Sequence, residues 1–498
     1  MKTLLKLFVL LLVVLLAVLG GIATFRVGPA PALTLEPGLP GLGRRTPVRV
    51  TAAAAGRGLS GLRLEVVQGD RVQVVAEKSF TSRPAWAFGG PRTERGELRA
   101  EAGADNVPGL VAGEAVLRAV AGRAGTWLRS PAPVVRELKL PVRLSPPTLS
   151  LVSTQHYVGQ GGAEAVVYRV GPTCVRDGVL AGEWFFPGYP LPGGGPEDRF
   201  ALFAVPYDLA DGTSVRLVVE DDVENQAEVA FVDQFFPKPF ATDRITLDDA
   251  FMGKVVPEIR QKTPEMSDRG SLLENYLAIN REVRAQNTKT LADLAGRSDL
   301  RFLWREAFLP MPNAKVMSAF ADRRTYFHDG REVDRQFHLG FDLASVQRAP
   351  VPAANAGRVV LARYFGIYGN TVVLDHGYGL MSLYGHLSTL AVAAGQEVAR
   401  GETLGQTGAT GLAGGDHLHF TMLLHGLAVN PNEWWDAHWI GDRLARKLGA
   451  ALPFVPSAGT ARAQARSGAP GKKAAAPRKG VGSKQGAPKR RPGPRGRR

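Results

Sequence analysis

The chain has 498 residues, a single cysteine and a formal net charge of +15. The length is too great for one ordinary domain. The lone Cys174 excludes a disulfide bond within the chain, and with it a fold held by cysteine bridges. Thirteen Lys or Arg residues and no acid lie in residues 462–498, so the rest of the chain carries only about +2.

An uncharged apolar run covers residues 7–25 and follows Lys2 and Lys6. It is close to the ~20 residues needed to cross a bilayer and longer than the roughly 7–15 of a cleaved signal core. We therefore predict a transmembrane signal anchor within residues 1–26, with the lysines in the cytoplasm and the body outside it. The sequence Ala30-Pro31-Ala32 is typical of a cleavage site, so a removed signal peptide is the alternative.

Two regions of strand pattern follow, and we interpret residues 33–141 and 142–244 as two Ig-like β-domains. In the first, apolar runs flank Gly69-Asp70, a two-residue hairpin signal. In the second, residues 215–219 and 228–232 form the clearest strands, and Cys174 is expected in the core. Neither region carries a catalytic motif, so both are expected to be spacers or binding modules.

Residues 245–306 are predicted to form a helical connector. Ser271 and Glu274 are spaced as a capping box, and apolar residues recur at helical spacing after them. The simpler interpretation is that this connector packs against a β-domain. The alternative is that it lies over a groove of the next domain and controls access to it.

Residues 307–440 concentrate the histidines, because seven of the nine in the chain lie between His328 and His425. Three motifs contain the informative ones: HLGFD at 338–342, YGHLS at 384–388 and GDHLHF at 415–420. Catalytic zinc needs three imidazole or carboxylate ligands and an open position for water. The motifs together therefore indicate a metal site.

Local geometry supports this interpretation. His417 and His419 are two residues apart in a predicted strand, so both imidazoles can enter one pocket while Leu418 and Phe420 face the core. Gly340, inside the first motif, suggests a tight bend.

The three motifs, NTVVLDHGYG at 370–379, a ladder of glycines from 395 to 411 and Asn430-Pro431 resemble the lysostaphin-like, or LytM-domain, zinc metallopeptidases of bacterial cell walls. The resemblance covers residues 308–439, about a quarter of the chain. It implies an antiparallel β-sheet domain that binds one Zn²⁺ per chain. The implied zinc ligands are His338, Asp342 and His419, and the implied catalytic residues are His386 and His417, which remain unliganded beside the metal-bound water.

Two positions depart from the family pattern. The usual Phe-Gly-x-Arg reads Phe320-Ala321-Asp322-Arg323, and Thr421 stands where Glu often follows HLHF. Neither position binds metal in the family, so these departures put substrate contacts or loop shape in doubt and leave zinc binding unaffected.

The sequence thus predicts a mainly β protein. Its expected function is that of a zinc-dependent endopeptidase that hydrolyses amide bonds in cross-link or stem peptides of peptidoglycan during cell-wall remodelling. Three alternatives stay open: a catalytically silent LytM-type scaffold that activates other wall hydrolases, a protease acting on proteins, and a purely structural envelope protein.

At the C-terminus, residues 442–449 are predicted to form a short helix, with Asp442 as its N-cap and Gly449 as its stop. Residues 455–498 lack aromatic residues and an apolar period, so we expect a disordered basic tail. The expected partners are peptidoglycan, the inner membrane through the N-terminal helix, and anionic envelope polymers through the tail; a merely solvated tail is the alternative. No nucleic acid is expected, because the body should lie in the periplasm as a single-pass membrane protein.

Overall fold

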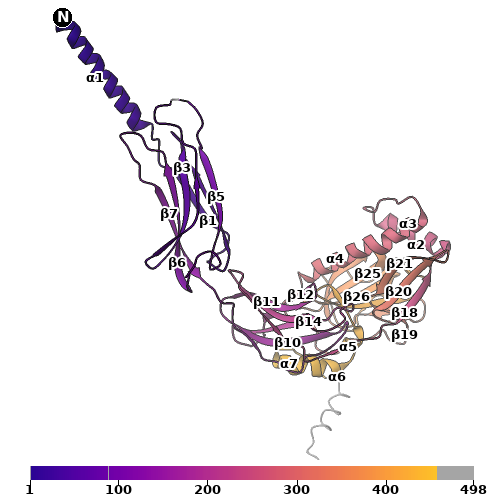
Figure 1. Cartoon of the computed structure of the whole chain (residues 1–498). Coiled ribbons are helices and arrows are strands. Elements are labelled where there is room, and N and C mark those ends of the chain that lie inside the picture. Colours follow the sequence, from indigo (N-terminus) through magenta and orange to yellow (C-terminus); the bar gives the residue numbers. More distant parts are fainter. Residues whose placement is uncertain (1, 88, 457–498) are drawn as a thin grey trace, which may run out of the picture. The chain divides into compact units, whose positions relative to one another are not determined.

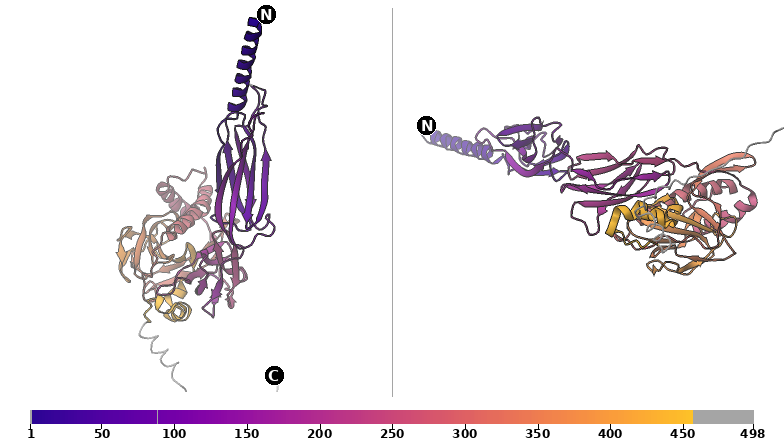
Figure 2. Two further views of the ribbon diagram at one scale, coloured as in Figure 1. Left: turned by 90° about the vertical axis from the view of Figure 1, so that its left-hand side faces the viewer. Right: turned by 90° about the horizontal axis from the view of Figure 1, so that it is seen from below.

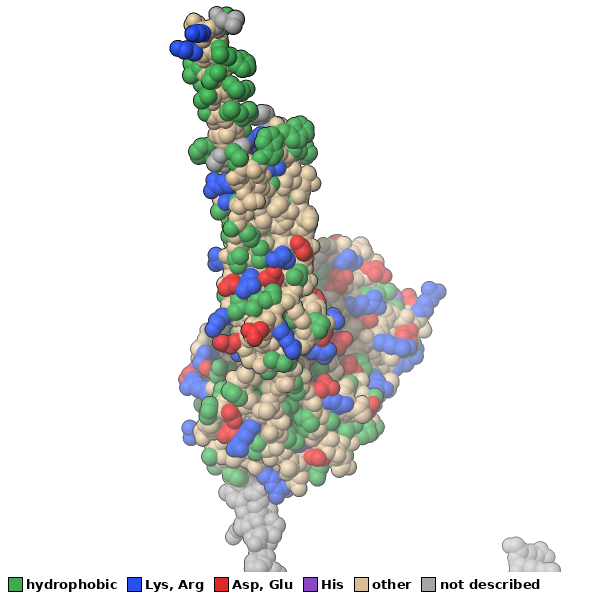
Figure 3. Space-filling view, turned by 60° about the vertical axis from the view of Figure 1, so that its left-hand side comes forward, with side chains coloured by type: hydrophobic (Ala, Val, Ile, Leu, Met, Phe, Trp, Pro, Cys, Tyr) green, Lys and Arg blue, Asp and Glu red, His purple; other side chains and the backbone are tan. Residues whose placement is uncertain are grey.

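The computed structural model describes residues 2–87 and 89–456, so most of the predicted tail lies outside the described residues. An apolar helix, α1 (Lys2–Phe25), comes first (Figure 1). The side chains of residues 2–19 are exposed, with Leu4 at 74% and Leu16 at 59%, and Figure 3 shows hydrophobic side chains along the helix. By length and composition, Lys2–Ile22 can cross a membrane, and a signal sequence meets the same criteria. The anchor therefore stays a prediction.

The first β-region consists of two sheets, with strand orders β1-β2-β5 and β4-β3-β6-β7 (Figure 2). The predicted hairpin is confirmed, because β3 and β4 are antiparallel and Gln68 pairs with Arg71 across the two-residue turn. Leu64 and Leu117 belong to a core that both sheets share. The Ig-like identity stays a prediction. The strands are β1 (Ala32–Pro37), β2 (Thr46–Ala53), β3 (Leu59–Gln68), β4 (Arg71–Ser79), β5 (Arg95–Ala102), β6 (Gly113–Arg123) and β7 (Val134–Val142).

The second β-region also has two sheets, ordered β13-β14-β10-β8 and β12-β11-β15-β16, and a parallel pair of β9 with β17. The two strands expected from the sequence are confirmed as β15 and β16. Cys174 is only partly buried at the start of β11, which differs from the expected core position. The strands are β8 (Leu149–Leu151), β9 (Tyr157–Gly159), β10 (Ala163–Val170), β11 (Cys174–Ala181), β12 (Trp184–Pro187), β13 (Tyr189–Pro190), β14 (Asp198–Ala204), β15 (Val215–Asp221), β16 (Gln226–Ala230) and β17 (Gln234–Phe236).

The connector begins with a strand, because β18 (Thr242–Thr246) pairs in parallel with β20 of the following region. Helices α2 (Asp249–Lys262), α3 (Leu272–Ala278) and α4 (Arg284–Ala295) come next, and a π-helical turn, η1 (Ile279–Val283), joins the last two. The capping box is confirmed by a hydrogen bond of 3.1 Å from the Glu274 N–H to Ser271 Oγ. The helical part is therefore shorter at both ends than the predicted connector of residues 245–306. Residues 245 and 246 belong to strand β18, and the last connector helix ends at Ala295.

An antiparallel sheet ordered β19-β22-β30-β26-β25-β24-β28 carries the C-terminal region, with β31 paired to β30, and the connector helices lie beside it in Figure 1. Smaller sheets are ordered β18-β20-β21 and β23-β29-β27. The elements are β19 (Lys315–Ser318), β20 (Asp322–His328), β21 (Arg331–His338), β22 (Phe341–Ala344), β23 (Pro350–Pro352), β24 (Gly357–Tyr364), η2 (Gly366–Tyr368), β25 (Asn370–Asp375), β26 (Leu380–Leu387), β27 (Thr389–Leu390), β28 (Glu397–Val398), β29 (Thr403–Gln406), β30 (Leu418–Leu424) and β31 (Leu427–Val429).

Short helical turns end the described chain: α5 (Pro431–Trp435), α6 (Ala437–Ile440), η3 (Gly441–Ala445), α7 (Arg446–Leu448) and η4 (Gly449–Ala451). The expectation that Asp442 caps a helix is wrong, because the helical run begins earlier and Asp442 lies inside it. Asp436 is the N-cap and accepts a hydrogen bond of 2.8 Å from the His438 N–H. Gly449, at a φ of +54°, ends α7 as expected, and the short turn η4 begins at the same residue.

The second β-region and the C-terminal region share one buried core, which includes Phe200 and Phe203 from one and Trp304 and Trp434 from the other. A buried ion pair also joins them, with Lys447 Nζ 2.8 Å from Glu164 Oε1. The Glu433 carboxylate accepts a hydrogen bond of 2.8 Å from the Ala163 N–H. These contacts make the two regions one packed unit.

Candidate metal centre

The candidate metal centre is built on two neighbouring strands and a short turn. Asp342 on β22 and His419 on β30 pair directly across the sheet, so their side chains lie side by side. His338 ends β21, and Gly340 lies between it and Asp342. A Cβ atom on Gly340 would lie 2.7 Å from His419 Nε2 and 2.6 Å from Thr421 Oγ1. This glycine is therefore required by the close approach of His419, in addition to any bend.

Three side-chain atoms from these residues converge. Asp342 Oδ1 lies 2.9 Å from His338 Nε2 and 2.9 Å from His419 Nδ1, and the two nitrogens are 3.2 Å apart. A tetrahedral zinc with bonds of about 2.0–2.2 Å would separate its ligand atoms by about 3.4 Å. The three atoms, which form a potential metal-binding group, therefore need to move by only a few tenths of an ångström to hold zinc.

The hydrogen bonds behind each ring select the tautomer of the neutral imidazole, and in that tautomer His338 Nε2 and His419 Nδ1 face the centre without a proton. His338 Nδ1 donates to the Ala319 carbonyl at 2.9 Å, which leaves a lone pair on Nε2. The Thr421 hydroxyl donates to the Leu339 carbonyl at 2.8 Å, so its oxygen must accept from His419 Nε2 at 3.0 Å. In that tautomer His419 Nδ1 also carries a lone pair, which faces the centre. Two lone pairs and a carboxylate oxygen in mutual contact repel one another unless a cation lies between them.

The charge states agree with this arrangement. Burial acts to raise the pKa of Asp342, but the surrounding histidines hold it well below its ordinary value, so the carboxylate is ionised. Burial lowers the pKa of His419 to about 4, so its ring is neutral at neutral pH. A carboxylate with neutral imidazoles is a donor set that suits zinc.

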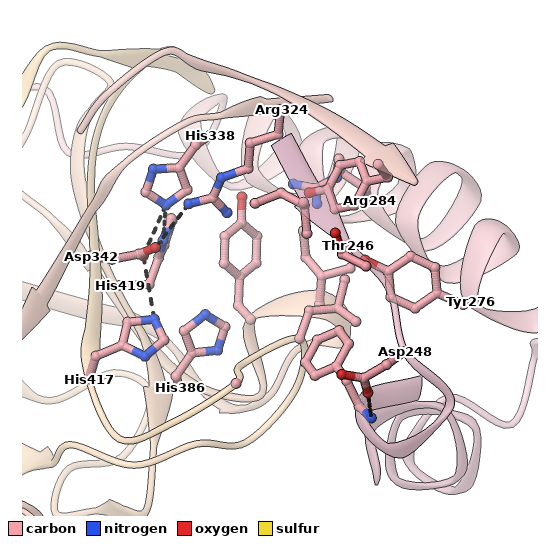
Figure 4. A pocket seen from close by; sticks show the side chains of 17 residues that line it. Thr246, Asp248, Tyr276, Arg284, Arg324, His338, Asp342, His386, His417 and His419 are labelled. Carbon is pink, nitrogen blue, oxygen red and sulfur yellow. Dashed lines mark hydrogen bonds and ion pairs between the residues drawn. The ribbon is translucent and has the colours of Figure 1, made fainter. Parts of the chain in front are cut away.

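The other two histidines of the motifs lie beside this group without completing it. His386 Nδ1 donates to the Thr410 carbonyl at 2.8 Å, and burial lowers the pKa of His386 well below its usual value. His417 Nδ1 donates to the Gly415 carbonyl at 2.9 Å. Burial acts to lower the pKa of His417, but the Asp342 carboxylate raises it overall. His386 thus turns Nε2 toward the pocket, whereas His417 Nε2 lies 3.4 Å from Asp342 Oδ1 (Figure 4).

The backbone of His386 supports a functional role. Its φ of +63° is in the left-handed region, which a side chain other than glycine rarely adopts. Strain of this kind persists where surrounding structure fixes it, and it is concentrated at functional sites. The rings of His386 and His417 lie 4.9 Å apart, so both face the same space.

A cavity of about 420 Å³ opens over these residues (Figure 4). All five residues expected from the sequence line it. The connector contributes to its wall through Thr246, Asp248, Tyr276 and Arg284. The position of the connector over the groove agrees with the alternative interpretation of the sequence, although control of access stays a prediction.

Three residues with roles at the site were not identified from the sequence. Arg324 Nη2 donates to Asp342 Oδ2 at 3.1 Å, whereas its neighbour Arg323, which matches the family motif, is exposed. Thr421 orients His419, as described above. Tyr368 lies with its ring 5.4 Å from that of His419. The alternation of a strand could have distinguished Arg324 from Arg323, but only with the register of β20 known.

The replacement of glycine by Ala321 has a visible consequence. Ala321 adopts a φ of +63°, so the backbone keeps the conformation that glycine accommodates best. Its N–H donates to the His338 carbonyl at 2.7 Å. The departure from the family pattern thus leaves the support of His338 in place.

Residues 336–431 match the model of peptidase family M23. This region is an M23 peptidase domain. The peptidoglycan DD-endopeptidase ShyA of Vibrio cholerae is 41% identical over 163 residues, which are 33% of this chain and 35% of ShyA. The murein hydrolase activator EnvC of Escherichia coli is 37% identical over 95 residues, or 19% of this chain and 23% of EnvC. The chain thus spans about a third or less of these curated relatives.

Among solved structures, a mutant catalytic domain of the prophage-encoded M23 protein EnpA from Enterococcus faecalis is similar to the M23 domain. It is 27% identical, has a TM-score of 0.22, and covers 25% of this chain and 95% of its own.

Proposed function

We propose that this protein is a zinc-dependent endopeptidase that hydrolyses amide bonds in the cross-link or stem peptides of peptidoglycan. The observation that carries the proposal is the convergence of Asp342 Oδ1, His338 Nε2 and His419 Nδ1 on one point. The substrate class is supported by the similarity of the M23 domain to relatives named peptidoglycan DD-endopeptidases.

His338, Asp342 and His419 would hold the zinc ion, which supplies a water of lowered pKa and polarises the scissile carbonyl. The chain's own residues do the remaining work. Arg324 fixes the Asp342 carboxylate, and Thr421 fixes the His419 ring. His386, with Nε2 facing the pocket, and His417, with Nε2 3.4 Å from Asp342 Oδ1, take the proton from the attacking water and return it to the leaving amine.

The proposal also places the protein at the inner membrane, with α1 as its anchor and the M23 domain in the periplasm. The supporting observation is the set of exposed leucines along α1. Protease added to spheroplasts should degrade the β-regions while α1 stays in the membrane fraction. A mature soluble form that begins near residue 33 would contradict the anchor.

The direct test is digestion of intact sacculi by the full chain, purified in detergent and loaded with zinc. We expect new muropeptides in which a peptide cross-link has been cut, identified by mass spectrometry. Treatment with a chelator should abolish their release, and added zinc should restore it. Casein treated in parallel should stay intact, since its cleavage would favour a general protease.

A catalytically silent activator is the second candidate, because EnvC is named a murein hydrolase activator. Protein with one zinc per chain that releases nothing from sacculi would favour it. Stimulation of a purified murein hydrolase by the same preparation would then establish that activity.

A further inference from the structure

Arg284 brings a positive charge to the metal pocket from outside the M23 domain. It is the first residue of α4 and lines the cavity that contains the three candidate zinc ligands. It also lines an adjoining cavity of about 410 Å³, together with Tyr368. The guanidinium therefore lies in the wall between two spaces that a long peptide substrate could occupy.

The local backbone places this side chain. The π-helical turn η1 ends at Val283, directly before Arg284. A π-helical turn inserts an extra residue into a helix and rotates the side chains that follow it, and such turns are common at functional sites. Within the described chain, η1 separates the part of the helix that carries Tyr276 from the part that carries Arg284, and both residues reach the pocket (Figure 4).

Hydrogen bonds hold the guanidinium in position without neutralising it. Its Nε donates to the Asn280 carbonyl at 3.0 Å and its Nη2 to Asn280 Oδ1 at 2.6 Å. The Asn280 amide nitrogen in turn donates to Asp334 at 2.8 Å, which fixes the orientation of the amide. Among residues 2–87 and 89–456, Arg284 has no carboxylate within ion-pair distance, and its Nη1 makes no hydrogen bond. By contrast, Arg281 on the same turn pairs with Asp334 at 2.9 Å.

The acids in the pocket wall already have other partners. Asp342 contacts Arg324 and the histidines, and Asp248 accepts a hydrogen bond of 2.7 Å from the Phe251 N–H as the N-cap of α2. Two arginines and a zinc ion against two carboxylates would give the lining a net charge of about +2. Arg284 and Arg324 both line this one cavity.

We infer that Arg284 is a specificity-determining residue that binds a free carboxylate of the substrate peptide close to the scissile amide. The inference rests on the proposed function and adds to it that the enzyme selects anionic peptides. The planar guanidinium, already oriented through Nε and Nη2, has Nη1 available for a charge-assisted hydrogen bond to a carboxylate oxygen.

The test compares a cross-linked muropeptide with the same molecule after chemical amidation of its carboxyl groups, using the zinc-loaded full chain. A hydrogen bond between charged groups corresponds to a factor of about 10–100 in kcat/KM, and we expect the native peptide to be preferred by that ratio. Arg284→Gln should reduce the ratio to near 1, mainly through KM, with zinc content unchanged. Arg284→Lys should restore part of the preference, since it keeps the charge.

Arg297→Gln is the matched control, because Arg297 is exposed near the end of the same helical segment and should leave the ratio unchanged. A readout independent of catalysis is calorimetric binding of a monomeric muropeptide and its amidated form. Wild-type protein should bind the native form about ten times more tightly, a difference that Arg284→Gln should remove.

The outcomes separate the two proposals. Cleavage of both peptides at equal rates, or a preference that survives in Arg284→Gln, would overturn the carboxylate site and leave the endopeptidase intact. Failure to cleave either peptide would overturn the endopeptidase, and the calorimetric comparison would then decide on Arg284 by itself.

Discussion

Two clusters of buried ionisable groups differ in how their charges face one another. In the metal-centre cluster (His338, Asp342 and His419), the outward hydrogen bonds of the rings leave three acceptor atoms pointing inward when both imidazoles are neutral. In the interface cluster (Glu164, Glu433 and Lys447), a lysine faces a carboxylate at 2.8 Å. The interface cluster is balanced by its own residues. The metal-centre cluster is balanced only by an added cation, which distinguishes a binding site from a structural ion pair.

The largest expected effect is the loss of a ligand. Asp342→Ala, His338→Ala and His419→Ala each leave two protein groups for zinc, so metal content and hydrolysis should both collapse, with activity falling by at least ~10⁴. Metal analysis and cleavage of a cross-linked muropeptide on the same preparations provide the measurement. Asp329→Ala, an exposed carboxylate in the same domain, should change neither. Zinc loss in His417→Ala but not in His419→Ala would reverse the assignment on that strand.

Substitution of the proton-transfer residues should separate activity from metal binding. His386→Ala and His417→Ala keep all three ligands, so zinc should stay near one per chain while turnover falls by about 10²–10⁴. The exposed His438→Ala serves as control. Full activity in both variants would remove the role of these histidines in proton transfer.

Substitutions in the interface cluster should lower the stability of the fold and leave the zinc content unchanged. Lys447→Met leaves the buried Glu164 carboxylate unpaired, so the free energy of unfolding should fall by about 3–5 kcal/mol, with zinc content unchanged. Denaturant unfolding at pH 8 measures it, and adding Glu164→Gln should recover much of the loss. Lys289→Met, which breaks an exposed pair with Asp293, should cost less than about 0.5 kcal/mol.

Thr421→Val tests the orientation of a ligand while preserving its identity. The valine keeps the shape of threonine but removes the acceptor for His419 Nε2, so zinc affinity should fall by about 10–100-fold. Competition with a chromophoric chelator measures this affinity. Thr290→Val, whose hydroxyl bonds only within its own helix, is the control. Unchanged affinity would show that the ring is held by packing alone.

The smallest expected effect is a pH dependence of stability from Glu433. Burial raises its pKa from 4.5 to about 8, so the folded protein binds this proton more tightly than the unfolded chain. Its stabilising contribution is complete below pH 4.5 and is lost as pH rises through 8. Because part of Glu433 keeps contact with solvent, we expect a loss of about 1–2 kcal/mol between pH 5 and 9. Glu433→Gln should flatten this profile in thermal unfolding, whereas an unchanged slope would assign it to another group.

The sequence was sufficient where local spacing determines geometry. The HxH spacing of His417 and His419, the hairpin at Gly69 and the cap at Ser271 each depend on a few neighbouring residues, and the structure contains all three arrangements. The roles of Arg324, Thr421 and Arg284 could not be predicted from spacing. They depend on strand register and on contacts between segments that are distant in the sequence. The start of the connector was wrong for the same reason, since β18 becomes a strand by pairing with β20.

The core shared by the second β-region and the M23 domain sets a lower limit on the size of a useful catalytic fragment. A fragment beginning at residue 307 would lack β18 and Trp304, and would uncover the ring of Tyr378, which lies 4.9 Å from that of Phe200 in the full chain. It would also lack Arg284 and the connector wall of the pocket. Engineering or crystallising this peptidase therefore calls for a piece that begins before the second β-region, near residue 143.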